Sequence, residues 1–175
     1  VMFNRRSFLN SSLTAASAAP LAADVDSDGS PEIISAAKSG EYIILSMAGV
    51  HYFDSQLSSN QITEGQATIS DFDQDGDQDL VVAEFGWRST GQIHILENLG
   101  LQEGIPQFRQ RVVDDRHGCI SVTPVDLNGD GKMDFVALIS QEHESVVGFF
   151  NRGDGTFRQQ TIFSAGNPSF GTSGL

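Results

Sequence analysis

The chain has 175 residues, and its 23 acidic and 10 basic side chains give a formal net charge of −13. This acidity argues against nucleic acid and anionic membranes as partners, because both bind basic faces. No apolar run approaches the roughly 20 residues of a membrane-spanning segment. The single Cys119 rules out an internal disulfide framework. With 39% hydrophobic residues, 18 Gly and many turn-forming residues, the composition predicts an all-β domain of short strands.

The N-terminal stretch has two interpretations. Phe3 to Leu9, FNRRSFL, matches strand-like runs that begin with an aromatic elsewhere in the chain. Arg5 and Arg6, followed by a mildly apolar stretch and an A-x-A-like site, also fit a twin-arginine export signal. Phe3 precedes the first Asp-rich segment by 21 residues, close to the 18 residues that recur later in the chain. This spacing favours the strand.

One pattern occurs three times along the chain. Each copy has an apolar lead-in, an Asp-rich loop and an apolar strand-like run, in ADVDSDGSPEII, SDFDQDGDQDLVVA and PVDLNGDGKMDFVAL. The first carboxylates of the loops, Asp24, Asp71 and Asp126, are 47 and 55 residues apart. The aromatics Phe53 and Phe108 each precede the next loop by 18 residues. Two markers with the same phase indicate a structural repeat.

Each repeat contains four predicted strands. In the second copy they are Gln66 to Ser70, Asp79 to Phe85, Gly91 to Glu97 and Gln107 to Val113. In the third they are Ile120 to Val125, Met133 to Ser140, Val146 to Asn151 and Phe157 to Phe163. The run LVVA in the second strand is typical of a strand buried on both faces. Four strands in about 50 residues predict β-propeller blades, whose faces are buried only against neighbouring blades.

The Asp-rich loops have the oxygen ligands of a hard cation. Oxygens at loop positions one, three, five and nine, with Gly at six for a sharp turn, can surround Ca²⁺, which takes six to eight oxygens. Position seven would contribute a backbone carbonyl. The candidate ligands are Asp24, Asp26, Asp28, Ser30 and Glu32 in the first loop; Asp71, Asp73, Asp75, Asp77 and Asp79 in the second; and Asp126, Asn128, Asp130, Lys132 and Asp134 in the third. The first loop is expected to be the weakest site, because Glu replaces Asp at position nine.

Two other interpretations of the loops fit the sequence less well. EF-hand and dockerin loops share the DxDxDG opening but need a carboxylate at position twelve, where this chain has Ser35, Val82 and Ala137. They also need helical flanks, and strands are predicted here. Alternatively the loops are metal-free turns, since Asp and Gly are common turn formers. Three copies in phase favour cation binding, with up to three Ca²⁺.

The loops, together with the segment NRGDGTF from Asn151, resemble the FG-GAP and VCBS repeats of integrin-α-like β-propellers. The resemblance implies that each Asp-rich loop joins the first two strands of a blade and binds structural calcium. It also implies an extracellular, cell-surface or periplasmic location. Such propellers have six to eight blades, whereas three are visible here: residues 18–58, 64–114 and 118–164. Residues 1–9 then belong to a preceding blade and 165–175 to a following one. Either the chain is part of a longer propeller, which is favoured, or copies associate as a homo-oligomer that completes the ring.

No catalytic signature is present, so the expected function is a binding or scaffolding module rather than an enzyme. The alternative is a lectin-like module, or a fragment of a propeller-fold polysaccharide lyase or hydrolase. Trp87 and Arg88 are speculative ligand-binding residues, because an aromatic beside an Arg can stack on a sugar or anchor a protein. Blade-junction packing is the favoured role for this pair. The RGD tripeptide from Arg152 to Asp154 is interpreted as a hairpin turn.

Overall fold

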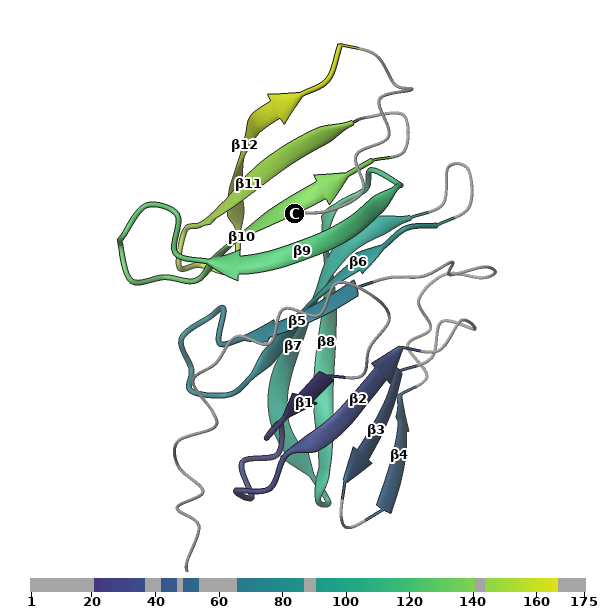
Figure 1. Cartoon of the computed structure of the whole chain (residues 1–175). Helices are drawn as coiled ribbons and strands as arrows, with labels where there is room; N and C mark the ends of the chain where they lie inside the picture. Colours follow the sequence, from purple (N-terminus) through teal and green to yellow (C-terminus); the bar gives the residue numbers. More distant parts are fainter. Residues whose placement is uncertain are drawn as a thin grey trace, which may run out of the picture.

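The computed structural model describes residues 21–36, 42–46, 49–53, 66–86, 91–140 and 144–166. These residues form twelve β-strands in three four-stranded antiparallel sheets, which follow one another in chain order (Figure 1). The predicted all-β class and the four-stranded blades are therefore confirmed. Within the described ranges there is no helix long and apolar enough to cross a membrane.

Each sheet is a meander in which strands adjacent in sequence are paired. The first sheet contains β1 (Leu21–Ala23), β2 (Glu32–Ala36), β3 (Tyr42–Ser46) and β4 (Gly49–Phe53). The second contains β5 (Gln66–Ser70), β6 (Asp79–Glu84), β7 (Gln92–Gln102) and β8 (Ile105–Asp114). The third contains β9 (Cys119–Val125), β10 (Asp134–Ile139), β11 (Ser145–Asn151) and β12 (Phe157–Ser164). Strands β5 to β12 agree with the predicted ones to within a few residues, apart from the longer β7.

The three Asp-rich loops occupy the same place in their sheets. Each connects the first strand to the second, and the last backbone pair before it is Ala23 with Glu32, Ser70 with Asp79, or Val125 with Asp134. Position nine of each loop is therefore the first residue of the second strand. The loops lie along one side of the molecule, at the left of Figure 1.

The core consists of two layers, one on each face of the second sheet. All six residues of β6 are buried. Leu80 and Val82 pack with the first sheet, whereas Val81 and Ala83 pack with the third. Successive side chains of a strand point to opposite faces, so a strand between two sheets must be apolar at every position. This explains the LVVA run.

The side chain at loop position two anchors the first two loops in the neighbouring core. Val25 of the first loop is 2% exposed and packs in the layer between the first and second sheets. Phe72 of the second loop packs in the next layer, with its ring 6.2 Å from that of Phe135 in an edge-on arrangement. Phe135 also stacks on Phe149 at 4.5 Å. These two acidic loops are thereby fixed to the interfaces between blades.

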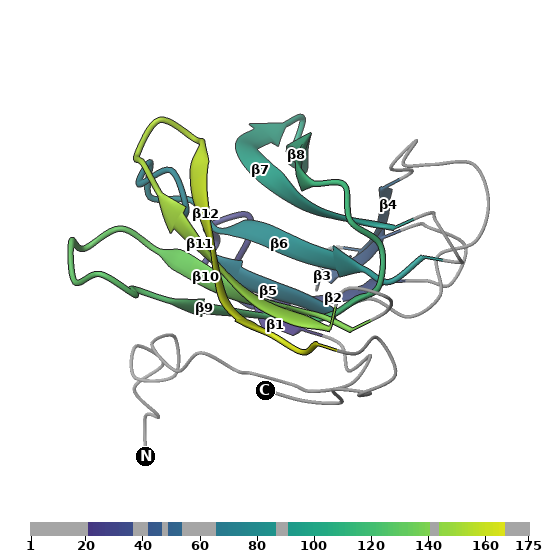
Figure 2. The same ribbon diagram turned by 90° about the horizontal axis from the view of Figure 1, so that it is seen from above.

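The hairpin of β7 and β8 is longer than the sequence indicates. The predicted strands stopped at Glu97 and resumed at Gln107, but pairing continues to Gln102 and Ile105 beyond an irregularity after Asn98. Glu103 and Gly104 form the turn with φ of 55° and 79°, as a two-residue turn of a tight hairpin requires. In the view from above, the β7–β8 hairpin is drawn at the top of the picture (Figure 2).

Several predicted features lie outside the described residues. These are the strand or export signal at Phe3 to Leu9, the pair Trp87 and Arg88, and most of the predicted further blade at 165–175.

Candidate metal centres

All three loops are built on the same turn. The carboxylate at position one accepts a hydrogen bond from the backbone N–H of the Gly at position six, from Gly29 to Asp24 at 2.9 Å and from Gly76 to Asp71 at 3.1 Å. The third loop repeats this bond at 3.0 Å. Gly76 has a φ of 101°, which an L side chain rarely adopts. The local sequence therefore determines the turn.

The carboxylates at position five act within the turn. Asp28 accepts the backbone N–H of Ser30 at 2.7 Å, and Asp75 accepts that of Asp77 at 2.9 Å. Neither carboxylate belongs to a group of converging acidic oxygens in the described structure. The side chain of Asp77 is also outside these groups.

The carboxylate at position nine is buried and is held by backbone amides. Glu32 and Asp79 are each 1% exposed. Glu32 accepts the N–H of Val25, and Asp79 accepts the N–H of Phe72, both at 2.9 Å. Burial raises the pKa of Asp79 to about 6, although its bonds from the Asn98 and Phe72 amides act in the opposite direction. Burial also raises the pKa of Glu32, and the other carboxylates of its loop raise it further.

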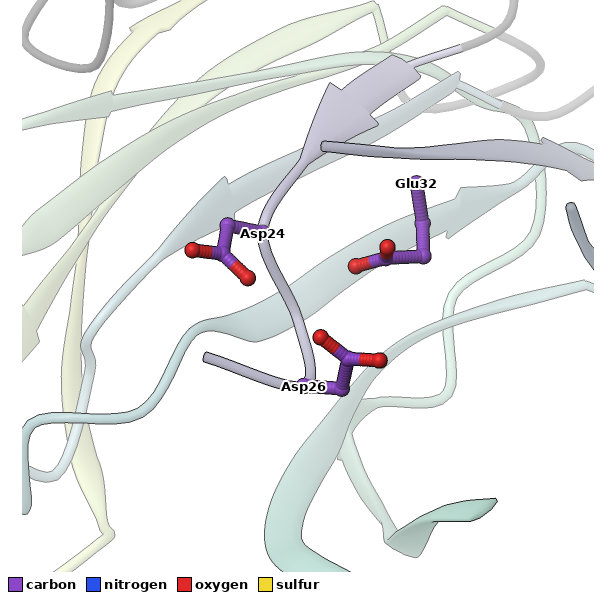
Figure 3. A group of neighbouring side chains, drawn as sticks. All are labelled: Asp24, Asp26 and Glu32. Atoms are coloured by element: carbon purple, nitrogen blue, oxygen red, sulfur yellow. The ribbon is translucent and has the colours of Figure 1, made fainter. Parts of the chain in front are cut away.

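Positions one, three and nine converge in the first two loops. The oxygens of Asp24, Asp26 and Glu32 lie within 4.8 Å of one another, and their side chains point toward a common centre (Figure 3). Asp71, Asp73 and Asp79 form the equivalent group in the second loop. The pKa of Asp73 is raised by burial and by its acidic neighbours. Ionising three such groups together is costly unless a positive charge lies among them.

The first two loops also leave one oxygen without a partner. Oδ1 of Asp24 and Oδ1 of Asp71 are buried and accept no hydrogen bond, although the second oxygen of each carboxylate accepts one from the turn. A buried acceptor without a partner is unfavourable. These two oxygens occupy the same loop position in two blades, so binding of the same kind of ligand in each loop would account for both.

The size of each group suits a calcium ion. Three oxygens at most 4.8 Å apart have a common point at most about 2.8 Å from each, close to calcium–oxygen bond lengths of about 2.3–2.6 Å. A small inward movement of the side chains would complete the contacts. The donor set consists of carboxylate oxygens, which hard cations prefer.

The third loop is arranged differently. Oδ1 of Asp126 accepts the N–H groups of Gly129 at 2.7 Å and Asp130 at 3.2 Å, so it is already satisfied. Nζ of Lys132 lies 2.9 Å from Asp130 and holds the pKa of that carboxyl below its usual value. Position three of this loop is Asn128, so positions one, three and nine hold two carboxylates instead of three. The third loop therefore has fewer carboxylates and no unpartnered oxygen at position one among the described residues, whereas the sequence ranks the first loop as the weakest site.

Two functional residues were missed by the sequence reasoning. Asn98 lies in β7 just before the irregularity in its pairing with β8, and its backbone N–H donates to Asp79 at 2.9 Å. Asn151 is the last residue of β11, and its backbone N–H donates to Asp134 at 2.7 Å. Each Asn is followed two residues later by a Gly, in NLG and NRG. The shared Asn-x-Gly pattern was the available signal. The carboxylates that accept these N–H groups lie 19 and 17 residues earlier in the chain, so the sequence does not show the pairing.

The RGD tripeptide lies in the turn between β11 and β12. The Arg152 N–H donates to the carbonyl of Thr156 at 3.0 Å, and the Asp154 carboxylate accepts the Thr156 N–H at 2.9 Å. Asp154 is thus used in closing the hairpin, as the sequence interpretation of a turn expects.

Stacked four-stranded sheets, each with an acidic loop between its first two strands, define a β-propeller-like repeat protein. Residues 71–137 match the family model of the FG-GAP-like repeat, so this part of the chain is an FG-GAP-like repeat, as its motifs predict. Among solved structures, the chain is similar to an Agrocybe aegerita lectin that recognises non-reducing terminal N-acetylglucosamine. The TM-score is 0.51 with 20% identity over 81% of this chain. The chain spans 37% of the length of that lectin. A comparison with curated proteins gives no match.

Proposed function

We propose that this protein is a calcium-stabilised β-propeller module that binds or displays a partner and has no catalytic chemistry of its own. The observation that carries the proposal is the convergence of three carboxylates in each of two equivalent loops, with the same buried oxygen unpartnered in both. The ligands would be Asp24, Asp26 and Glu32 in one centre, and Asp71, Asp73 and Asp79 in the other. Backbone carbonyls at position seven and water would complete the six to eight oxygens.

The third loop is a weaker candidate centre. Asp126, Asn128 and Asp134 have the predicted ligand types, but Asp126 already accepts bonds from its own loop. The net formal charges from Asp, Glu and Lys are −4, −5 and −2 in the three loops. Affinity for Ca²⁺ rises with the number of charged ligands. We therefore expect calcium to fill the second and first loops before the third.

Calcium is favoured over magnesium by the size of the groups. Mg²⁺ needs a tighter octahedron at about 2.0–2.1 Å and gives up its waters reluctantly. The carboxylates here are fixed by backbone amides at wider spacing. When bound, the ion would neutralise the buried carboxylates and hold each loop to its blade.

Calorimetry and thermal melts in calcium and in chelator test the proposal. At free Ca²⁺ 100 times the Kd, one occupied site stabilises the fold by about 2.7 kcal/mol. For a chain of this size that corresponds to a rise in melting temperature of about 5–10 °C. Mg²⁺ at equal concentration should give a much smaller rise. No calcium heat and no shift on chelation would refute the metal component.

The partner is proposed to be a protein or a glycan outside the cell. A carbohydrate-binding role is the second candidate, and the sugar named for the lectin gives a first ligand to test, terminal N-acetylglucosamine. A glycan array, together with turnover assays on acidic polysaccharides, separates a lectin from a lyase or hydrolase. Native mass spectrometry tests whether copies associate to complete a ring, with two copies supplying six blades.

A further inference from the structure

The side chain of Asn98 connects the second blade to the loop of the first. Its Nδ2 donates to the carbonyl of Val25 in the first loop at 2.9 Å and to the carbonyl of Gln78 in its own blade at 3.2 Å. Its Oδ1 accepts the N–H of Gly100 at 3.0 Å. Asn98 is 1% exposed, and every hydrogen-bonding group of its amide has a partner. A buried polar side chain satisfied in this way fixes the groups around it.

Asn151 makes the same set of contacts one blade later. Its Nδ2 donates to the carbonyl of Phe72 in the second loop at 2.6 Å and to that of Met133 at 3.1 Å. Its Oδ1 accepts the N–H of Gly153 at 2.9 Å. The residue is 4% exposed. Two copies with matching partners show that this link belongs to the repeat rather than to one accident of packing.

The links join the candidate centres into one hydrogen-bonded path. In the first loop, Glu32 holds the N–H of Val25, and Asn98 holds the carbonyl of Val25. The Asn98 N–H donates to Oδ1 of Asp79, while Oδ2 of Asp79 accepts the N–H of Phe72. The carbonyl of Phe72 then accepts from Asn151. Position nine of each loop is therefore both a candidate cation ligand and a member of this path.

We infer that Asn98 and Asn151 are positioning residues that couple neighbouring calcium loops across the blade interfaces. The coupling rests on the proposed calcium binding, whereas the positioning of each loop by the following blade does not. Because the position-nine carboxylate is shared, an ion that orders one loop also orders the Asn that holds the loop before it. Calcium binding in the first and second loops is then positively cooperative. A coupled pair of sites differs from independent ones by a factor of about 5–150 in affinity.

Hydrogen exchange in chelator tests the positioning without calcium. Asn151→Ser removes the donor to Phe72, so exchange should rise at least about tenfold in residues 71–79 of the preceding blade, with little change in residues 24–32. Gln159→Ser is the matched control, because Gln159 donates to the Val113 carbonyl of the second blade at 3.4 Å, away from the loop. A uniform rise throughout the chain, or equal effects of the two variants, would show general destabilisation and overturn the inference. If Asn151→Ser does not fold, Asn98→Ser carries the same test at residues 24–32.

Calcium titration tests the coupling. Asp26→Asn removes the first site, and calcium affinity in the second loop should then fall about fivefold or more. In the Asn98→Ser background the same substitution should leave the second loop unchanged. An affinity independent of Asp26→Asn in the native background would overturn the coupling. Absence of calcium binding in every variant would refute the proposed function and the coupling together, while the exchange pattern would still decide whether the Asn residues position the loops.

Discussion

The sharpest prediction compares two aspartates of the second loop that differ by four positions. Asp73 belongs to the converging group with Asp71 and Asp79. The Asp77 carboxylate lies outside that group and faces the β7–β8 hairpin, with Oδ2 3.9 Å from the place a Cβ would take on Gly100. Asp73→Asn and Asp77→Asn each remove one negative charge from the same loop. Comparing the two variants therefore separates the loss of a direct calcium ligand from the loss of a nearby negative charge.

The expected magnitudes follow from distance. A divalent ion about 2.8 Å from a carboxylate oxygen gains about 3 kcal/mol from it even at the dielectric constant of water. Losing that contact lowers affinity about 100-fold, or more because the loop is partly buried. A carboxylate one Debye length away, about 8 Å, contributes about 0.4 kcal/mol after screening. Asp77→Asn should then weaken calcium binding only about twofold.

Isothermal titration calorimetry on calcium-free protein measures both affinities. An Asp26→Asn background removes the first site, so that the tightest remaining binding reports the second loop. Circular dichroism melts in chelator confirm that each variant is folded. Equal losses from Asp73→Asn and Asp77→Asn would show that the ligands have been assigned wrongly.

The other predictions concern pH, packing and the third loop. Burial lowers the pKa of His94 from 6.5 to about 4. The native state therefore resists protonation of His94, and up to about 3 kcal/mol of stability is lost as the pH falls from 6.5 to 4. Chemical denaturation of His94→Asn should show a weaker dependence of stability on pH in this range, and an unchanged dependence would contradict this. Phe72→Ala should cost about 3–5 kcal/mol in urea unfolding, because the ring is 3% exposed in the core. Leu127 has the same position in the third loop but is only half-buried, so Leu127→Ala should cost less than about 1.5 kcal/mol. A cost for Phe72→Ala no larger than that for Leu127→Ala would contradict anchoring of the second loop by the Phe72 ring. Lys132→Gln removes the cation beside Asp130 and should strengthen calcium binding in the third loop several-fold by calorimetry, while weaker binding would show that Lys132 supports the site.

The sequence predicted the strands well where the signal is local. Alternation, the continuous LVVA run and the Asp-rich turns depend on neighbouring residues, and the structure has strands at those places. It predicted the β7–β8 connection less well, because Gly100, Gly104 and Pro106 are typical of loops. The backbone nevertheless pairs Leu101 with Pro106 and Gln102 with Ile105. A tight turn at Glu103 and Gly104 allows the strands to continue.

The candidate site was only partly predictable, because its arrangement depends on contacts that are not local in sequence. The three loops have similar sequences, so spacing assigns the same five ligand positions to each. The structure distinguishes them by where their hydrogen bonds go, because Asp126 accepts amides that Asp24 and Asp71 do not. It also shows that the carboxylates at position five serve the turn rather than the converging groups.

The sequence by itself determined the repeat, the four-stranded sheets and the acidic turns, because each is encoded within a few neighbouring residues. Only the tertiary structure decided which carboxylates converge and what holds them in place. Asn98 and Val25 are 73 residues apart, and Asn151 and Phe72 are 79 apart. Their hydrogen bonds form only when one blade packs against the next and excludes water from the junction. No local pattern can specify such contacts, since they depend on the burial of both partners.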